Sequence, residues 1–165
     1  MSQQGALEDE HGFTLIEVIV TIIIMGIVFS IASSMWFGAI ESRKVDSATN
    51  QLAADLRQAH SRATNRLASQ TVTLTSGSSE YTMTGVADPL DLDDCDAEDV
   101  ANGDCETEDV VVANVPATPA TLEFKADGSV VITGANPITV ESSKDDTKNH
   151  TIEINSATSR IRVVP

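Results

Sequence analysis

The 165-residue sequence predicts an α+β fold, in which one long N-terminal helix covers a face of an antiparallel β-sheet. Two observations support this fold class. Residues 13–67 are first apolar throughout and then apolar at steps of three and four, as in an amphipathic helix. From residue 69 onward, short runs rich in Val, Ile and Thr alternate with turn residues, as in a series of strands.

Residues 13–40 form the apolar first part of the predicted helix, where Glu17 is the only ionisable side chain. About 20 helical residues suffice to cross a bilayer core, so this part is long enough to span a membrane. Residues 1–12 carry three acids and no Lys or Arg, unlike the basic start of a secretory signal peptide. An ordinary signal anchor is the alternative, but an acid within it costs up to about 3 kcal/mol on insertion.

Residues 41–68 continue the helix with an apolar face that we expect to pack on the sheet. His60 lies in this part, and we expect it to be a partly covered surface residue rather than a ligand. The residues of the apolar face are Val45, Ala48, Leu52, Leu56, Ala59, Ala63 and Leu67.

The remaining residues, 69–165, are predicted to form the β-rich part of the chain. The first two strands should pair as a hairpin across residues 76–79, and Asp127-Gly128 and residues 144–149 predict further tight turns. The expected strands are 71–76, 80–85, 110–115, 121–128, 129–134, 138–142, 151–155 and 160–164.

An acidic segment, 88–109, interrupts these strands with eleven acids and no base, so the rest of the chain carries only −4 of the net charge of −15. One interpretation is a solvated loop closed by a disulfide between Cys95 and Cys105, which implies an oxidising compartment. Such a bond would contribute about 2–3 kcal/mol. The alternative is a calcium site, although the spacing does not match an EF-hand. Its oxygen ligands would be Asp91, Asp93, Asp94, Asp96 and Asp99.

Composition and motifs argue against two function classes. The strong negative charge opposes nonspecific nucleic-acid binding, which requires Lys and Arg to displace phosphate counterions, and Arg160 and Arg162 are the only basic pair suited to DNA. The sequence contains no G-x-S-x-G, H-E-x-x-H or P-loop motif, and its three histidines are scattered. We therefore expect neither an enzyme nor any cofactor other than calcium.

The stretch G-FTLIE, from Gly12 to Glu17, resembles the type IV prepilin signature of type IV pilins and type II secretion pseudopilins. The resemblance implies that a prepilin peptidase cuts between Gly12 and Phe13 and methylates the new amine of Phe13. It also implies that Glu17 meets the terminal amine of a neighbouring subunit, which turns two costly charges into a pair. The acidic leader departs from the family, whose leaders usually carry Lys or Arg.

The C-terminal half carries a second resemblance. LEFKADGSV (122–130) and TIEINSATSRIRVV (151–164) are similar to H-type minor pseudopilins and FimT-like minor pilins. That group usually has Gly before the first Arg of the last strand, where this chain has Ser159. The residues Phe124, Asp127 and Gly128 are interpreted as parts of a hairpin and not as a catalytic site.

Together the resemblances imply a pilin-like roll with a leader (1–12), a transmembrane or filament-core helix (13–40), its amphipathic half (41–68) and a β-rich extracytoplasmic domain (69–165). The implied function is a minor pilin or pseudopilin, a structural subunit of a type II secretion pseudopilus or type IV pilus in the inner membrane. Implied partners are other such subunits, prepilin peptidase, the inner-membrane assembly platform and membrane lipid. The alternative is a tip-located binding module that adheres, recruits a secreted substrate or takes up DNA.

Overall fold

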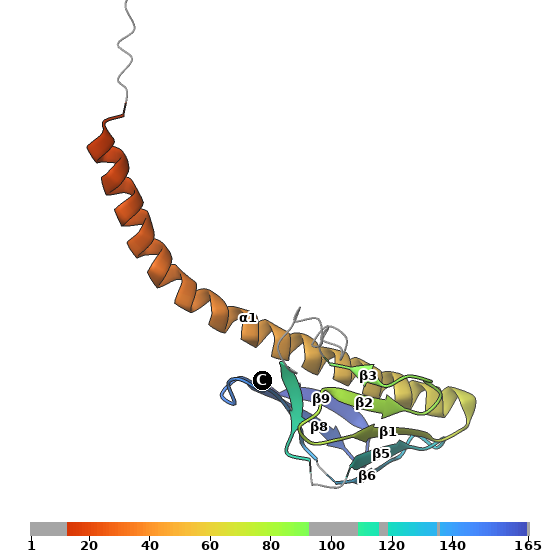
Figure 1. Cartoon of the computed structure of the whole chain (residues 1–165). Coiled ribbons are helices and arrows are strands. Elements are labelled where there is room, and N and C mark those ends of the chain that lie inside the picture. Colours follow the sequence, from red (N-terminus) through yellow and green to blue (C-terminus); the bar gives the residue numbers. More distant parts are fainter. Residues whose placement is uncertain (1–12, 93–108, 116–118, 135, 165) are drawn as a thin grey trace, which may run out of the picture. The chain divides into compact units, whose positions relative to one another are not determined.

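The computed structural model describes residues 13–92, 109–115, 119–134 and 136–164. One helix, α1 (Leu15–Arg66, 52 residues), confirms the helix predicted over 13–67. The described strands follow it in the order β1 (Gln70–Leu74), β2 (Glu80–Met83), β3 (Leu90–Asp91), β4 (Val110–Ala113), β5 (Ala120–Phe124), β6 (Val130–Thr133), β7 (Ile138–Ser142), β8 (Asn149–Asn155) and β9 (Arg160–Val164) (Figure 1).

The chain divides into two compact units, Met1–Gly38 and Ala39–Pro165, and α1 contributes residues to both. In the first unit, every side chain from Phe13 to Ala32 is exposed within the chain. The second unit contains all the strands, and its buried core begins at Val45. Among the described residues, the hydrophobic core thus lies in the second unit.

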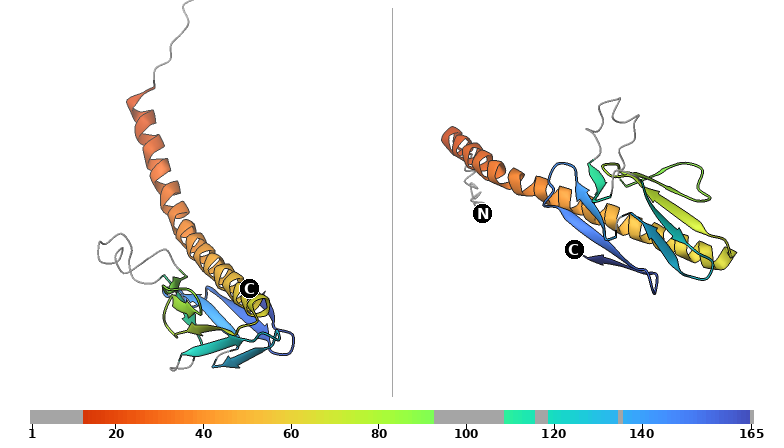
Figure 2. Two further views of the ribbon diagram at one scale, coloured as in Figure 1. Left: turned by 90° about the vertical axis from the view of Figure 1, so that its right-hand side faces the viewer. Right: turned by 90° about the horizontal axis from the view of Figure 1, so that it is seen from below.

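The described strands form two antiparallel sheets. The five-stranded sheet has the order β3-β2-β1-β5-β6, and the four-stranded sheet has the order β4-β7-β8-β9. The predicted hairpin is confirmed, with Leu74 opposite Tyr81. Both sheets lie on the same side of the second half of α1 (Figure 2). The predicted α+β class, with a long helix packed on antiparallel β-structure, is therefore confirmed.

The two sheets are joined at the outer edge of β4 by the turn between β1 and β2. The Gly77 N–H donates to the Val112 carbonyl at 2.9 Å, and the Val112 N–H donates to the Ser78 carbonyl at 3.0 Å. These bonds occupy backbone groups of β4 that no neighbouring strand pairs. The opposite edge of the four-stranded sheet is β9.

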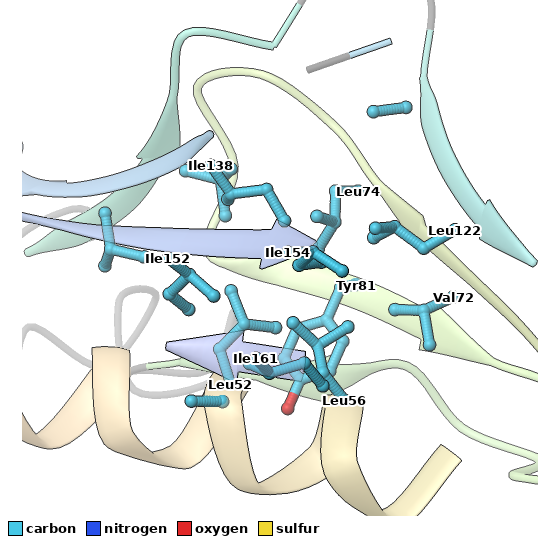
Figure 3. Packing of buried hydrophobic residues seen from close by; sticks show 14 of the residues in the cluster. Leu52, Leu56, Val72, Leu74, Tyr81, Leu122, Ile138, Ile152, Ile154 and Ile161 are labelled. Atoms are coloured by element: carbon cyan, nitrogen blue, oxygen red, sulfur yellow. The ribbon is translucent and has the colours of Figure 1, made fainter. Parts of the chain in front are cut away.

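The second half of α1 packs its apolar face on the two sheets. Leu52 and Leu56 are fully buried and point toward Ile161 of β9 in the core (Figure 3). Thr49 is also buried, and its hydroxyl donates to the Val45 carbonyl at 2.7 Å, which satisfies its polar group. The predicted apolar face is confirmed up to Ala63.

Leu67 was predicted to belong to this face and does not, since it is 78% exposed. It lies just past the helix end with a φ of 53°, in the left-handed region that favours glycine. The Ala68 N–H donates to the Ala63 carbonyl at 3.3 Å, which is the bond of a Schellman C-cap. The chain therefore reverses at Leu67 and leads into β1.

A polar contact also holds α1 to β2. The Tyr81 hydroxyl donates to a carboxylate oxygen of Asp55 at 2.5 Å, beneath the helix. Burial is the main cause that raises the pKa of Tyr81 above its usual range, and the hydrogen bond to Asp55 and the charge of that residue raise it further. The hydroxyl is thus a neutral donor at any physiological pH.

The carbonyl of Gly128 joins three elements. It lies in the predicted tight turn between β5 and β6, where Gly128 has a φ of 83°. His60 of α1 places Nε2 at 3.2 Å from this oxygen, and the Ser159 hydroxyl donates to it at 2.5 Å. Ser159 has a φ of 52°, which gives a physical reason for the glycine usual at this position. His60 is half-buried, as predicted.

Candidate functional site

The first candidate site is the start of α1, where Thr14 caps the helix. The Thr14 hydroxyl accepts a hydrogen bond from the Glu17 N–H at 3.3 Å, and the Thr14 carbonyl accepts from the Glu17 and Val18 N–H groups at 3.1 and 3.2 Å. The spacing Thr-x-x-Glu is that of a capping box, and an acid in the first turn complements the helix dipole. The Thr-x-x-Glu spacing is a signal in the sequence from which this cap could be predicted.

The carboxylate of Glu17 is available to another molecule. Its residue is exposed, and no side chain among the described residues forms an ion pair or hydrogen bond with it. Phe13 is 83% exposed beside it. Gly12 lies outside the described residues. The cap thus satisfies the backbone N–H of Glu17, but its carboxylate has no charged partner in the described part of the chain.

The helix that follows has the length and composition of a membrane span. Residues Leu15–Ala32 have a mean hydropathy of 2.7, and none of them is buried within the chain. Thr21, the polar side chain after Glu17, donates its hydroxyl to the Val18 carbonyl at 2.8 Å. Its hydrogen-bonding group is therefore satisfied without water.

The acidic segment is described only at its two ends. At the first end, Gln51 of α1 donates its side-chain N–H to the Asp91 carbonyl at 2.8 Å, and Leu92 is buried. In the part of the chain that the structure describes, no three His, Cys, Asp or Glu side chains gather as metal ligands would. The remaining predicted residues lie outside the described ranges, and they are Asp93, Asp94, Cys95, Asp96, Asp99 and Cys105.

At the second end, Asp109 is held by two lysines. Its carboxylate pairs with Lys44 of α1, and with Lys144 at 2.8 Å. The Ser143 N–H donates to the Asp109 carbonyl at 3.0 Å. Burial of Asp109 opposes its ionised form, but the hydrogen bonds and charges of Lys144 and Lys44 outweigh it and hold the pKa below its ordinary value. This ion pair fixes the chain just before β4.

A groove of about 700 Å³ lies on β8, β9 and the turn between them. Cross-strand pairing places Arg160 opposite Asn155 and Arg162 opposite Glu153. All four side chains are exposed. The structure therefore brings the predicted basic pair to one surface, and Glu153 is the one acid among the described residues that line it. The residues lining the groove are Glu153, Asn155, Thr158, Arg160 and Arg162.

Comparison with known proteins agrees with these features. The prokaryotic N-terminal methylation motif matches residues 9–33, which include the start of α1 and the apolar segment. The family of type II transport protein GspH matches residues 48–158, about two thirds of the chain. No curated protein and no solved structure matches significantly. The protein therefore belongs to the family of type II transport protein GspH, within the pilins and pseudopilins, whose members are structural subunits and not enzymes.

Proposed function

We propose that this protein is a minor pseudopilin that is anchored in the inner membrane by α1, processed at its N-terminus and assembled with other subunits. The observation that carries the proposal is the exposed apolar segment Leu15–Ala32 directly after the Thr14–Glu17 cap. A helix that is apolar on all sides requires lipid or other proteins around it. In a filament subunit, lipid would surround this helix before assembly, and the helices of neighbouring subunits would surround it afterwards.

Processing is proposed between Gly12 and Phe13. Glycine lacks a side chain, so the backbone before the scissile bond can enter a narrow protease site. Replacement of Gly12 by Leu should therefore leave the leader attached, and the mass of the isolated protein would include residues 1–12. Gly26→Ala is the matched control, because a Cβ at Gly26 meets nothing within 4 Å. A normal mature mass in Gly12→Leu would refute this cleavage site.

Cleavage gives Glu17 a chemical partner. A new α-amine has a pKa of about 8 and is mostly cationic at neutral pH. Neither this cation nor the carboxylate is well solvated in a membrane, so a pair between the amine of one subunit and Glu17 of the next lowers the free energy of assembly. The pair would also fix the axial register between subunits.

Glu17→Gln separates the charge from the helix cap, since Gln also serves at the third position of a capping box. We expect normal processing but strongly reduced co-assembly with partner subunits, measured by co-purification of sheared filaments. Thr21→Val is the control, because the Thr21 hydroxyl bonds only within its own helix. If Glu17→Gln assembles normally and Glu17→Ala does not, Glu17 acts through the cap and the charge proposal fails.

The compartment of the second unit follows from the same proposal. A chain anchored at Leu15–Ala32 with its leader in the cytoplasm places residues 39–165 outside it, where a bond between Cys95 and Cys105 would persist. Non-reducing mass spectrometry of the full chain isolated from membranes would show a loss of two hydrogens. Two free thiols in that preparation would remove the disulfide from the proposal.

A second candidate function, a tip-located binding module, is favoured by the groove on β8 and β9. Its two arginines present guanidinium groups suited to carboxylates or phosphates. For DNA, retarded migration of single strands at physiological salt should disappear in Arg160→Ala/Arg162→Ala. Unretarded migration of the unaltered chain would exclude that version, in keeping with the charge of −15.

A further inference from the structure

We propose that the groove on β8 and β9 binds the acidic segment, residues 93–108, of a second copy of this chain. The contact would join neighbouring subunits through their second units. It rests on the proposed function as a filament subunit, and it is separate from the pairing at Glu17.

The groove is a local positive surface on an acidic protein. Arg160 and Arg162 are alternate residues of β9, so both point to the exposed face of the strand. A third guanidinium, Arg57 of α1, donates to the Ile161 carbonyl between them at 3.3 Å. Within the described residues, neither Arg160 nor Arg162 forms an ion pair with an acidic side chain. Among the described residues that line the groove, Glu153 is the only one with a carboxylate side chain.

The acidic segment supplies the complementary chemistry. Residues 93–108 contain eight acids and no base. Arginine binds carboxylates through two parallel hydrogen bonds, which a lysine does not offer. The chain enters this segment from buried Leu92 and leaves it at Asp109, which Lys44 and Lys144 hold. Because both ends are held, sixteen residues at up to about 3.4 Å each let the segment extend at most about 27 Å from its anchors, which is enough to contact an adjoining copy.

The sheet order favours a contact between copies. Asp109 directly precedes β4, and β4 and β9 are the two opposite edges of the four-stranded sheet. Three strand spacings of about 4.8 Å separate these edges. Complementary surfaces at opposite edges of one domain form a head-to-tail contact, and repetition of such a contact builds an open helical array when its rotation does not close a ring. This geometry matches a filament subunit better than a closed dimer.

An acidic segment also suits the groove better than nucleic acid does. A nucleic acid would run its phosphates along a protein of net charge −15, which repels them. A short acidic segment brings its charge to the arginines alone, and beyond a Debye length of about 8 Å salt screens the remaining acids. The inferred contact should therefore be weak, salt-sensitive and strengthened by the high local concentration within a filament.

Photo-crosslinking of the full chain in detergent micelles tests the contact. The probe is benzoylphenylalanine in place of exposed Thr158, which lines the groove, and the sample mixes ¹⁵N-labelled and unlabelled copies. We expect crosslinks that join a labelled to an unlabelled copy and map to residues 93–108. The same probe at Val131, an exposed position on β6 of the other sheet, is the control and should not give them.

Charge reversal sharpens the result. Arg160→Glu/Arg162→Glu should reduce the crosslink about tenfold, as should about 1 M salt, where the Debye length is about 3 Å. A second copy carrying Asp93→Lys, Asp94→Lys and Asp96→Lys should restore the crosslink to the reversed groove. Crosslinks within one copy, crosslinks outside 93–108, or failure of the swap to restore them would overturn the inference.

Two further outcomes are decisive. Protection of the groove by a DNA oligonucleotide, without crosslinks between copies, would assign it to nucleic acid and overturn this inference. If the chain is processed normally and its assembly depends on Glu17, but the crosslink between copies is absent, this inference fails and the proposed function stands. An unprocessed chain, in contrast, would contradict the proposed function.

Discussion

Both halves of α1 carry many apolar residues, but they meet different surroundings. None of the residues Leu15–Ala32 is buried within the chain, whereas the apolar side chains of the stripe from Val45 to Ala63 are buried against two sheets. The first half is apolar on all sides, and the second is apolar along one stripe. The arrangement of apolar residues around the helix, more than their number, therefore shows whether a helix is covered by its own domain.

Residue size differs as well. The buried stripe alternates Val and Leu with small residues, and alanines let the sheet approach the helix closely. The exposed half is rich in Ile and Val, which present large surfaces in every direction. Lipid and neighbouring helices adapt to such a surface, but a single sheet covers only one side of it.

The strongest test of this comparison removes equivalent apolar volume from each half. Leu56→Ala, at a fully buried site, should lower the free energy of unfolding by about 2–5 kcal/mol. Ile23→Ala, at a site 55% exposed, should change it by less than about 0.5 kcal/mol. Denaturant unfolding of the full chain in micelles, followed by the circular dichroism of the sheets, measures both. Equal effects would contradict separate roles for the two halves.

A smaller effect is expected for Asp109, which pairs with Lys44 close to the start of the buried half of α1. Asp109→Asn removes the charge that Lys44 and Lys144 share, and at pH 7 it should lower the free energy of unfolding by about 1–3 kcal/mol. The folded pKa of Asp109 is depressed, so its contribution is present above the unfolded pKa of about 4. It is lost as pH falls through the folded pKa.

The difference between wild type and Asp109→Asn should therefore shrink in acid. Asp146→Asn, the same change at an exposed residue nearby, serves as the control and should be nearly neutral at every pH. A gap that stays constant from neutral to acidic pH would show that Asp109 acts through packing and not through its charge.

The smallest effect on stability is expected at Leu67, just past the C-terminal end of α1. Leu67 has a φ of 53° and is 78% exposed, so Leu67→Gly removes backbone strain with little loss of packing. We expect stabilisation of up to about 1 kcal/mol, measured by thermal unfolding. Leu67→Ala keeps the Cβ and should give no gain. If both substitutions destabilise the chain, Leu67 contributes contacts that its exposure does not reveal.

The fold could be predicted in its elements but not in its pairing. A regular stripe located the helix to within two residues at either end, and alternation located the strands on both sides of the acidic segment. Alternation carries no information about partners, however. Gln70 of β1 pairs with Phe124 of β5, far along the chain, and the division into two sheets follows from such pairings. Strand β3, of two residues, is too short to show a pattern.

The candidate site shows the same limit. Glu17 was visible in the sequence because a lone acid in an apolar run is costly, and the cap at Thr14 was visible in its spacing to Glu17. The pairing of Lys44 with Asp109 could not be predicted from the sequence, because 65 residues separate the two side chains. Local motifs are readable from sequence, while contacts between distant segments require the fold.

The bond from Arg57 to Ile161 has a consequence for the timing of folding. Its partners are 104 residues apart, and Ile161 also covers Leu52 and Leu56 in the core. The amphipathic half of α1 is therefore synthesised early but stays partly uncovered until β9 arrives. Long-range closure of this kind is slow. A chain interrupted before residue 161 would keep that helix face exposed to proteases.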